Sequence, residues 1–197
     1  LGAELAITAH HGAWAETTQG FLPACHLMPL GQHLADPVTV AESLLHTPYL
    51  WGGNSRAGLD CSGLVQLAFA AAGIALPGDS DLQQTAGQDI PADAPLRRGD
   101  LIFWKGHVAI IVDDSRLIHA NGHSMSVAYE DTKACIARIL AQAGGPVTHR
   151  RRVLSSHALV DRPYRLFQNP QRCGQIMTPA QNLPFAAAHR IKALPRP

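Results

Sequence analysis

Cys61 is the residue of this sequence that is best placed for covalent chemistry. It follows a glycine-rich stretch, residues 49–60, and opens an apolar run with helical spacing that stops at Gly73. Asp60 is a preferred N-cap residue, so the pattern predicts a helix that begins at Cys61. A thiol in the first helical turn lies near the positive end of the helix dipole, and a basic side chain nearby lowers its pKa from about 8.5 to roughly 3.5–7.5. We therefore predict a reactive thiolate; the alternative is a small buried apolar residue.

Two histidines, His107 and His119, lie in apolar segments that have the pattern of successive strands in a hairpin. A three-residue loop at 113–115 places Val112 opposite Arg116, and then Ala109 faces His119. His107 lies one diagonal step away on the same face of the sheet. We predict that the two imidazoles project together; the alternative is one buried and one exposed histidine.

Together, Cys61, His107 and His119 have the composition of a thiol acyl-transfer site. A cysteine nucleophile needs a base that takes its proton, and the base needs a third polar group that fixes its tautomer and orientation. The two histidines fit these two roles, and this combination is more specific than a lone cysteine.

The first part of the chain, residues 1–36, has the pattern of short strands around a polar turn at 17–20. The predicted strands are residues 5–7, 13–16 and 20–23. This is too little chain for an independent sheet, so we interpret residues 1–36 as the C-terminal part of a small β-barrel.

The rest of the chain predicts an α+β fold that ends near residue 152. Asp36 and Pro37 mark a helix start, and Thr47-Pro48 marks its end. Its predicted buried side chains are Val38, Ala41, Leu44 and Leu45. The other predicted elements are a short helix near 79–84, strands at 101–104, 107–112 and 116–120, and an amphipathic helix over 130–143 that buries Ala134, Ile136, Ile139 and Leu140. From Val153 onward the pattern is lost, and we interpret residues 153–197 as a poorly ordered tail.

Composition narrows the class of protein. The 197 residues are 46% hydrophobic and 16% charged with a formal net charge of +1, which is typical of a globular chain and gives no electrostatic argument for nucleic acid. No apolar run is long enough to span a membrane. The four cysteines lack the spacing of a zinc site, so we expect free thiols, no metal and no cofactor.

Five sequence blocks resemble the NlpC/P60 family of cell-wall cysteine peptidases. They are Pro48-Tyr-Leu-Trp-Gly-Gly, Leu59-Asp-Cys-Ser-Gly-Leu, Arg98-Gly-Asp-Leu-Ile-Phe, Gly106-His-Val-Ala-Ile and Ile118-His-Ala. The resemblance covers residues 37 to 150 and implies a papain-like α+β core, with a helix-start cysteine packed on an antiparallel sheet. It also implies hydrolysis of peptidoglycan stem peptides or muropeptides at the γ-D-glutamyl–diamino acid bond, through a thioester.

The resemblance assigns a role to each matching residue. Cys61 is similar to the family's nucleophile, His107 to its base and His119 to its orienting residue. Tyr49 matches the tyrosine whose hydroxyl lies beside the sulfur and helps to stabilise the oxyanion. The backbone N–H of Cys61 is a second candidate oxyanion donor. Trp51 is expected to be a packing residue.

The stretch Gly20-Phe-Leu-Pro-Ala-Cys-His-Leu resembles the end of a bacterial SH3-type barrel. In family members with that arrangement, the substrate has a free N-terminal L-alanyl-γ-D-glutamate. Asp60 would then pair with the α-ammonium, although its alternative role, the helix N-cap, is favoured. Ser62, Asp79 and Ser80 are further candidates for this subsite. Gly78 departs from the arginine that related sequences tend to carry.

The sequence thus predicts three regions: 1–36 as part of an SH3-like barrel, 37–152 as a cysteine peptidase and 153–197 as a tail. Two alternatives stay open, namely another thiol amidase or acyltransferase on the same scaffold, and a catalytically degenerate wall-binding module. The sequence leaves open the oligomeric state. It also leaves open whether the protein acts in the bacterial cytoplasm or in the cell envelope.

Overall fold

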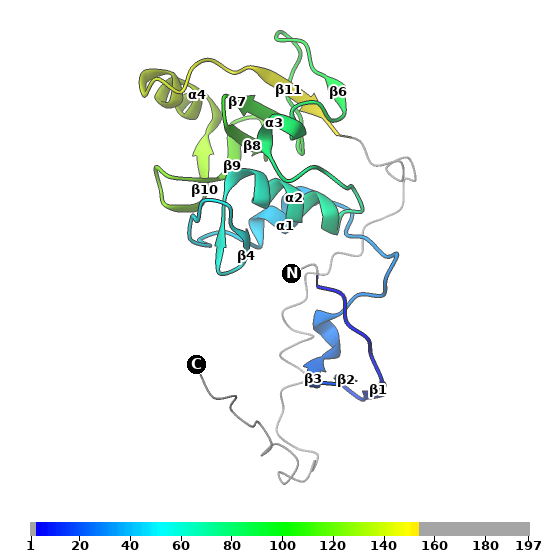
Figure 1. Cartoon of the computed structure of the whole chain (residues 1–197). Coiled ribbons are helices and arrows are strands. Elements are labelled where there is room, and N and C mark those ends of the chain that lie inside the picture. The colour runs from blue at the N-terminus through cyan, green and yellow to red at the C-terminus, as the bar shows by residue number, and fades with distance from the viewer. Residues whose placement is uncertain (1–2, 154–197) are drawn as a thin grey trace. The chain divides into compact units, whose positions relative to one another are not determined.

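The computed structural model describes residues 3–153 of the chain (Figure 1). Residues 7–27 form one compact unit, and residues 28–153 belong to another. The predicted tail, apart from Val153, lies outside the described residues. None of the helices within residues 3–153 has the length and apolar character that crossing a lipid bilayer requires.

The N-terminal unit is a three-stranded antiparallel sheet in the order β1-β2-β3. The strands are β1 (Ala9–His11), β2 (Trp14–Thr17) and β3 (Gly20–Pro23), followed by the short helix η1 (Ala24–His26). The predicted turn at 17–20 is confirmed, but the predicted strand at 5–7 is wrong. The chain reverses at Gly12, which has a φ of +58°, so His11 pairs with Trp14 and the first strand lies at 9–11.

Residues 28–153 are built around a six-stranded antiparallel sheet in the order β10-β9-β8-β7-β11-β6. Its strands are β6 (Gln88–Asp89), β7 (Leu101–Trp104), β8 (His107–Ile111), β9 (Arg116–Asn121), β10 (Ser126–Asp131) and β11 (His149–Arg152). A small ladder, β4 (Asn54–Ser55) with β5 (Gly58–Leu59), precedes them.

Helices cover both faces of this sheet. They are α1 (Pro37–Glu42), α2 (Cys61–Ala71), α3 (Ser80–Gln83) and α4 (Thr132–Ala141). Alternate residues of β8 point to opposite faces: Val108 and Ile110 pack in the cluster that contains α1 and α2, whereas Ala109 and Ile111 pack in the cluster that contains α4. Figure 1 shows α1 and α2, which contact each other, beside the sheet. The predicted α+β class with an antiparallel sheet is confirmed.

Helix α1 begins where the sequence predicts, because the Asp36 side chain accepts a hydrogen bond of 2.9 Å from the Val38 N–H. It ends earlier than predicted, at Glu42. The chain continues as turns with i−3 hydrogen bonds, and His46, with a φ of +67°, ends them. Leu44 is buried as expected, and Leu45 is half-buried.

The predicted amphipathic helix lies near its true position, and its predicted buried face is correct in part. Helix α4 begins after Asp131, whose side chain accepts from the Ala134 N–H, so residues 130 and 131 belong to β10. Ile139 is buried as expected and Ile136 is half-buried, whereas Ala134 and Leu140 are exposed, and the helix also buries Thr132 and Cys135.

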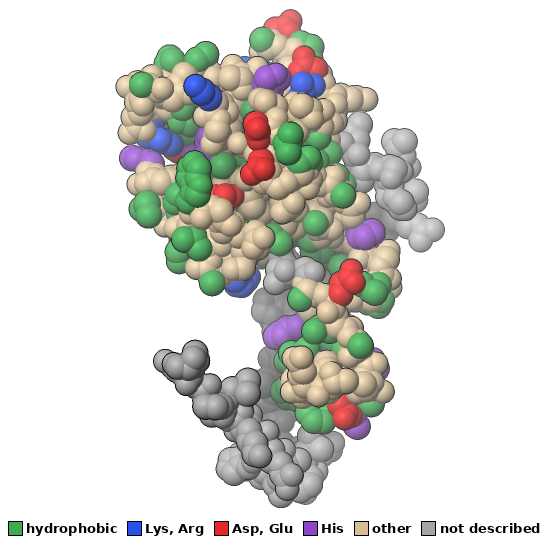
Figure 2. All heavy atoms as spheres, in the orientation of Figure 1, with side chains coloured by type: hydrophobic (Ala, Val, Ile, Leu, Met, Phe, Trp, Pro, Cys, Tyr) green, Lys and Arg blue, Asp and Glu red, His purple; other side chains and the backbone are tan. Residues whose placement is uncertain are grey.

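Strand β11 was not predicted, because its sequence His149–Arg152 carries three consecutive arginines and no apolar side chain. It is held by polar contacts. The Arg152 guanidinium donates to both oxygens of the buried Asp100 carboxylate, at 2.7 and 2.6 Å. On the molecular face drawn in Figure 2, acidic and basic side chains are interspersed, in keeping with the small net charge.

Candidate active site

The first turn of α2 is fixed by the carboxylate of Asp60. Its Oδ1 accepts from the Gly63 N–H at 2.7 Å and from the Ser62 hydroxyl at 3.1 Å, and its Oδ2 accepts from the Gly52 N–H at 2.9 Å. The predicted N-cap is therefore confirmed. The same side chain also ties the loop before the helix to the helix itself.

Glycines let this loop lie directly against α2. A Cβ on Gly63 would overlap the carbonyl oxygen of Gly53, and a Cβ on Gly53 would overlap the backbone of Gly58. The Asp60 N–H donates to the Gly53 carbonyl at 3.0 Å, which closes the loop. The glycines of the two sequence blocks around Cys61 thus allow the first turn of α2, which carries the thiol, to pack directly against the preceding loop.

Cys61 is 8% exposed, and its sulfur lies 4.0 Å from the carbonyl oxygen of Gly106, the residue that precedes β8. Burial raises the pKa of this thiol, and the negative charge of Asp60 adds to the effect. Hydrogen bonds from the backbone N–H groups of Val108, Ser62 and Cys61 lower the pKa, but by less than burial raises it. The prediction of a resting thiolate is therefore wrong, since desolvation outweighs the helix N-terminus.

The two histidines lie together, as the predicted hairpin requires. The pairs Ile110–Ile118 and Ile111–Leu117 have the predicted register. His107 Nε2 lies 2.8 Å from His119 Nδ1, and the ring centroids are 5.1 Å apart. His119 is 1% exposed.

The hydrogen-bonded chain continues through two residues that sequence reasoning missed, Glu130 of β10 and Arg138 of α4. His119 Nε2 lies 3.2 Å from Glu130 Oε2. The Arg138 guanidinium donates to both oxygens of Glu130, at 2.8 and 2.7 Å. Because Ala128 pairs with His119, Glu130 lies one diagonal step from His119 on the same face, and a prediction of β10 would have found it.

Burial keeps both imidazoles neutral. It lowers the pKa of His107 to about 4, and the positive charge of Arg138 adds to this effect. The pKa of His119 falls to about 3 because of burial and then the neighbouring His107. The Arg138 hydrogen bonds hold the pKa of Glu130 at about 2, so its carboxylate is ionised.

Tyr49 lies at the same site. Burial raises the pKa of its hydroxyl, and the neighbouring Cys61 and Asp60 raise it further, which places the phenol within electrostatic reach of both. Its backbone N–H donates to the Met125 carbonyl at 2.9 Å and holds the segment before the loop. Trp51, by contrast, is 84% exposed, so its predicted packing role is wrong; Gly52, with a φ of +73°, turns the chain outward beside it.

A small pocket of about 180 Å³ lies beside the first turn of α2. Its lining residues are Gly52, Gly53, Asn54, Asp60, Gly63, Gln66, Gly78 and Asp79. Two predicted subsite residues, Asp60 and Asp79, therefore share one pocket. Ser62 is buried beneath it and bonded to Asp60, whereas Ser80 begins α3 and does not line the pocket.

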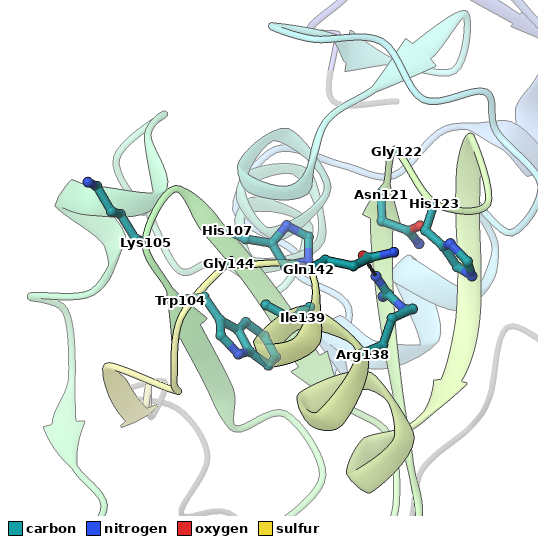
Figure 3. A pocket seen from close by; sticks show the side chains of 10 residues that line it. All are labelled: Trp104, Lys105, His107, Asn121, Gly122, His123, Arg138, Ile139, Gln142 and Gly144. Carbon is teal, nitrogen blue, oxygen red and sulfur yellow. Dashed lines mark hydrogen bonds between the residues drawn. The ribbon is translucent and has the colours of Figure 1, made fainter.

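A larger pocket of about 470 Å³ has His107 in its wall. Figure 3 shows the imidazole of His107 and the guanidinium of Arg138 at this pocket, with Arg138 hydrogen-bonded to Gln142. Lys105 and His123 line it as well. No Asp or Glu is among the lining residues, and the Arg138 guanidinium there is paired with Glu130.

One group of side chains within the described residues could offer ligands to a metal ion. The ligand atoms of His119, Glu130 and Cys135 lie within 4.8 Å of one another. Among the described cysteines, Cys25, Cys61 and Cys135 are free thiols, as expected.

The NlpC/P60 family model matches residues 46–142, which contain all of these side chains except Cys25. These residues form an NlpC/P60 domain. Two solved structures support the assignment. An NlpC/P60 family protein from Bacillus cereus ATCC 10987 superimposes with a TM-score of 0.59 at 25% identity, covering 77% of this chain and 54% of that chain. For the peptidoglycan hydrolase RipB of Mycobacterium tuberculosis the TM-score is 0.52 at 29% identity, covering 67% and 71%.

Relatives of the NlpC/P60 domain occur in longer proteins. The γ-D-glutamyl-L-lysine dipeptidyl-peptidase of Bacillus subtilis (strain 168) is 37% identical over 93 residues, which cover 43% of this chain and 31% of that protein. The bifunctional muramidase/DL-endopeptidase CwlT of the same strain is 40% identical over 96 residues, covering 44% and 28%. The chain thus spans less than a third of the length of these two relatives.

Proposed function

We propose that this chain is a cysteine peptidase that hydrolyses peptidoglycan stem peptides or muropeptides at the γ-D-glutamyl–diamino acid bond. The observation that carries the proposal is the Cys61 sulfur at the start of α2, against the backbone that begins β8, together with the bonded pair His107–His119. Support for the substrate class comes from the relatives, one of which is a γ-D-glutamyl-L-lysine dipeptidyl-peptidase.

In the proposed reaction, the Cys61 sulfur attacks the scissile carbonyl carbon while His107 takes the thiol proton. The tetrahedral oxyanion accepts hydrogen bonds from the Cys61 N–H and the Tyr49 hydroxyl. The carbon–nitrogen bond then breaks, and the departing amine takes the proton from His107. Water next attacks the thioester and gives a proton to His107, and cleavage of the carbon–sulfur bond returns that proton to the thiol.

The pocket beside α2 is the proposed site for the substrate's free N-terminal amine. Asp60 and Asp79 supply carboxylates there, and Ser62 is bonded to Asp60, whereas Ser80 is a further candidate that does not line the pocket. The Asp60 oxygens already accept three hydrogen bonds, so an ammonium group would share Oδ2 with the Gly52 N–H. Gly78, where related sequences tend to carry arginine, lines this pocket without a side chain.

We also propose that residues 1–36 are the C-terminal part of an SH3-type barrel and that residues 37–152 are the peptidase domain. The sheet β1-β2-β3 supports the first assignment. The alternatives, another thiol amidase or acyltransferase and a degenerate wall-binding module, differ in what the protein does to a stem peptide.

The deciding experiment is incubation with L-Ala-γ-D-Glu-meso-diaminopimelate, followed by mass analysis of the products. We expect free diaminopimelate and L-Ala-D-Glu from the wild-type chain and neither from Cys61→Ala. Cys25→Ser, which removes an exposed thiol from the N-terminal unit, is the matched control and keeps full activity. An intact substrate after exposure to the wild-type chain, or cleavage by Cys61→Ala, would contradict the proposal.

Amine recognition is tested with the same peptide after N-acetylation. If Asp60 binds the ammonium, acetylation and Asp60→Asn each raise KM for the peptide, and acetylation has no further effect on the variant. Asp131→Asn changes the equivalent N-cap of α4 and controls for loss of a capping carboxylate. Equal rates for free and acetylated peptide would remove this subsite.

A further inference from the structure

We propose that Glu130 and Arg138 are positioning residues that fix the tautomers of His119 and His107, so that Nδ1 of His107 is the basic nitrogen. The tautomer assignment stands on the geometry of the α4 face alone. Its consequence for hydrolysis rests on the proposed function. Neither Glu130 nor Arg138 touches the Cys61 thiol, and both act through His119.

The assignment follows from what each atom can donate or accept. An ionised carboxylate only accepts, so the nitrogen that faces Glu130 Oε2 at 3.2 Å, His119 Nε2, carries the proton. In a neutral ring the other nitrogen, His119 Nδ1, then accepts. It lies 2.8 Å from His107 Nε2, which must therefore donate. The lone pair of His107 is left on Nδ1.

Arg138 makes this chain directional. It binds both oxygens of Glu130, at 2.8 and 2.7 Å, and so keeps the carboxylate ionised and fixes its plane. A protonated Glu130 could donate to His119 Nε2. That change would reverse both tautomers and put a proton on His107 Nδ1, which would remove the base.

The elements that carry Cys61 and these positioning groups lie around different faces of the sheet. The nucleophile is on α2, on one face of the sheet, whereas His119, Glu130 and Arg138 come from β9, β10 and α4 around the other face. His119 is fully buried between them, and the side chains of Glu130 and Arg138 are 20% and 19% exposed. The ion pair is thus partly buried, and its two hydrogen bonds fix its orientation.

A metal ion at His119, Glu130 and Cys135 is the competing interpretation of this cluster. Arg138 already supplies a positive charge there, since its guanidinium binds Glu130 and lies 3.7 Å from the Cys135 sulfur. Burial, and then the charge of Glu130, raises the pKa of Cys135 to about 12, so its thiol is neutral beside the ion pair. The donor set therefore fits an ion pair with a neutral thiol.

The second competing interpretation is that the ion pair only anchors α4 to the sheet. The two roles differ in what happens to the imidazole protons. Glu130→Gln keeps the shape of the side chain, but its amide can either accept from or donate to His119 Nε2. Both tautomers of His119, and hence of His107, become accessible in that variant. A mere anchor would leave the tautomers unchanged.

The test is ¹⁵N NMR of the histidine rings in the full chain, combined with kinetics on the proposed peptide substrate. In the wild type we expect the Nε2–H tautomer for both His107 and His119. In Glu130→Gln we expect mixed tautomers and a fall in kcat of roughly 10- to 100-fold with little change in KM. Arg138→Lys, which keeps the charge, should retain the wild-type tautomers and most of kcat.

Asp113→Asn is the matched control, because it breaks another carboxylate–guanidinium pair, the one with Arg116. That pair lies at the loop end of the hairpin that carries His107 and His119. It should change neither the tautomers nor kcat. Nδ1–H tautomers in the wild type, or unchanged tautomers in Glu130→Gln, would overturn the proposal. Shifts of the His119 signals on addition of zinc would show a metal site and overturn it as well. If the wild type fails to hydrolyse the peptide, the proposed function fails, and the NMR result still decides the tautomers.

Discussion

At the scale of single residues, the site combines a protonated thiol with two neutral imidazoles. Burial raises the pKa of Cys61 and lowers the pKa of His107 to about 4, so a thiolate–imidazolium pair is disfavoured at rest. In the proposed reaction, proton transfer from sulfur to His107 would then accompany the attack on the substrate. The two carboxylates at this site accept hydrogen bonds from other groups, Asp60 from the Gly63 N–H and Glu130 from Arg138. Neither carboxylate therefore takes the proton of the Cys61 thiol.

This resting state predicts how Cys61 reacts with iodoacetamide. Only the thiolate is alkylated, so the rate should keep increasing with pH beyond about pH 8.5, where an ordinary thiol is half ionised. Mass spectrometry of the Cys61 peptide measures the rate, and the exposed Cys25 in the same chain gives an internal reference. A fast rate that is constant between about pH 5 and pH 8 would instead reveal a thiolate–imidazolium pair and contradict the prediction.

Residues whose signals are local could be predicted from sequence. Asp60, Cys61 and the hairpin histidines were found because a cap, a helix start and a short loop fix their positions within a few residues. Glu130 and Arg138 were missed because their contact with His119 depends on the pairing of β9 with β10 and on α4. The Cys61 pKa was predicted in the wrong direction, since the depth of burial depends on how α2 packs on the sheet.

At the scale of elements, the decisive contact is the one between the loop 50–60 and the first turn of α2. Gly63 lacks a side chain where the Gly53 carbonyl approaches the helix, and Gly53 lacks one where the Gly58 backbone approaches. The element that presents Cys61 is thus a helix pressed against its own preceding loop. Any side chain inserted at that contact must push the two apart.

Gly63→Ala should therefore destabilise the protein, by about 1–3 kcal/mol as overpacked sites usually do. Urea unfolding followed by tryptophan fluorescence measures the change. Gly78→Ala is the matched control at the edge of the same pocket, because its Cβ would make only an ordinary contact, 3.7 Å from Gln66 Nε2. Equal urea midpoints for Gly63→Ala and the wild type would show that the loop can move away from α2 without loss of stability, and would contradict the prediction.

Elements with an apolar signal were predicted well and edge elements were not. The strands β7, β8 and β9 carry consecutive buried apolar residues, which identify them without knowledge of their partners. The strands β6 and β11 are polar, and β11 is held by the ion pair of Arg152 with the buried Asp100. Such strands form through backbone hydrogen bonds to a neighbouring strand, and the periodicity of apolar residues in the sequence does not reveal that pairing.

At the scale of the whole NlpC/P60 domain, Cys61 is on α2 on one face of the sheet, whereas Glu130 and Arg138 are on β10 and α4 around the other. The α4 face mixes an apolar cluster with the chain from His107 to Arg138. Placing two imidazoles in that interior has a cost for stability that depends on pH. The sign of this dependence follows from the two lowered pKa values.

An unfolded chain binds protons at histidine with a pKa of about 6.5, whereas the folded protein holds His107 at about 4 and His119 at about 3. Below pH 6.5 the unfolded state therefore takes up protons that the folded state does not. The stability is fully present above that pH and is lost as the pH falls towards 4 and then 3. At 1.36 kcal/mol per pKa unit, one such imidazole accounts for roughly 3 kcal/mol across this window.

We accordingly predict that the free energy of unfolding decreases between pH 7 and pH 4 and that the decrease is shallower in His119→Gln. Glutamine cannot titrate, so the variant loses one of the two contributions while His107 keeps its own. Urea denaturation at each pH, with m-values compared to confirm two-state unfolding, measures both slopes. Identical slopes would mean that His119 is protonated in the folded state or that it titrates equally in both states. Either result would contradict the neutral imidazole pair from which the direction of proton transfer at Cys61 is derived.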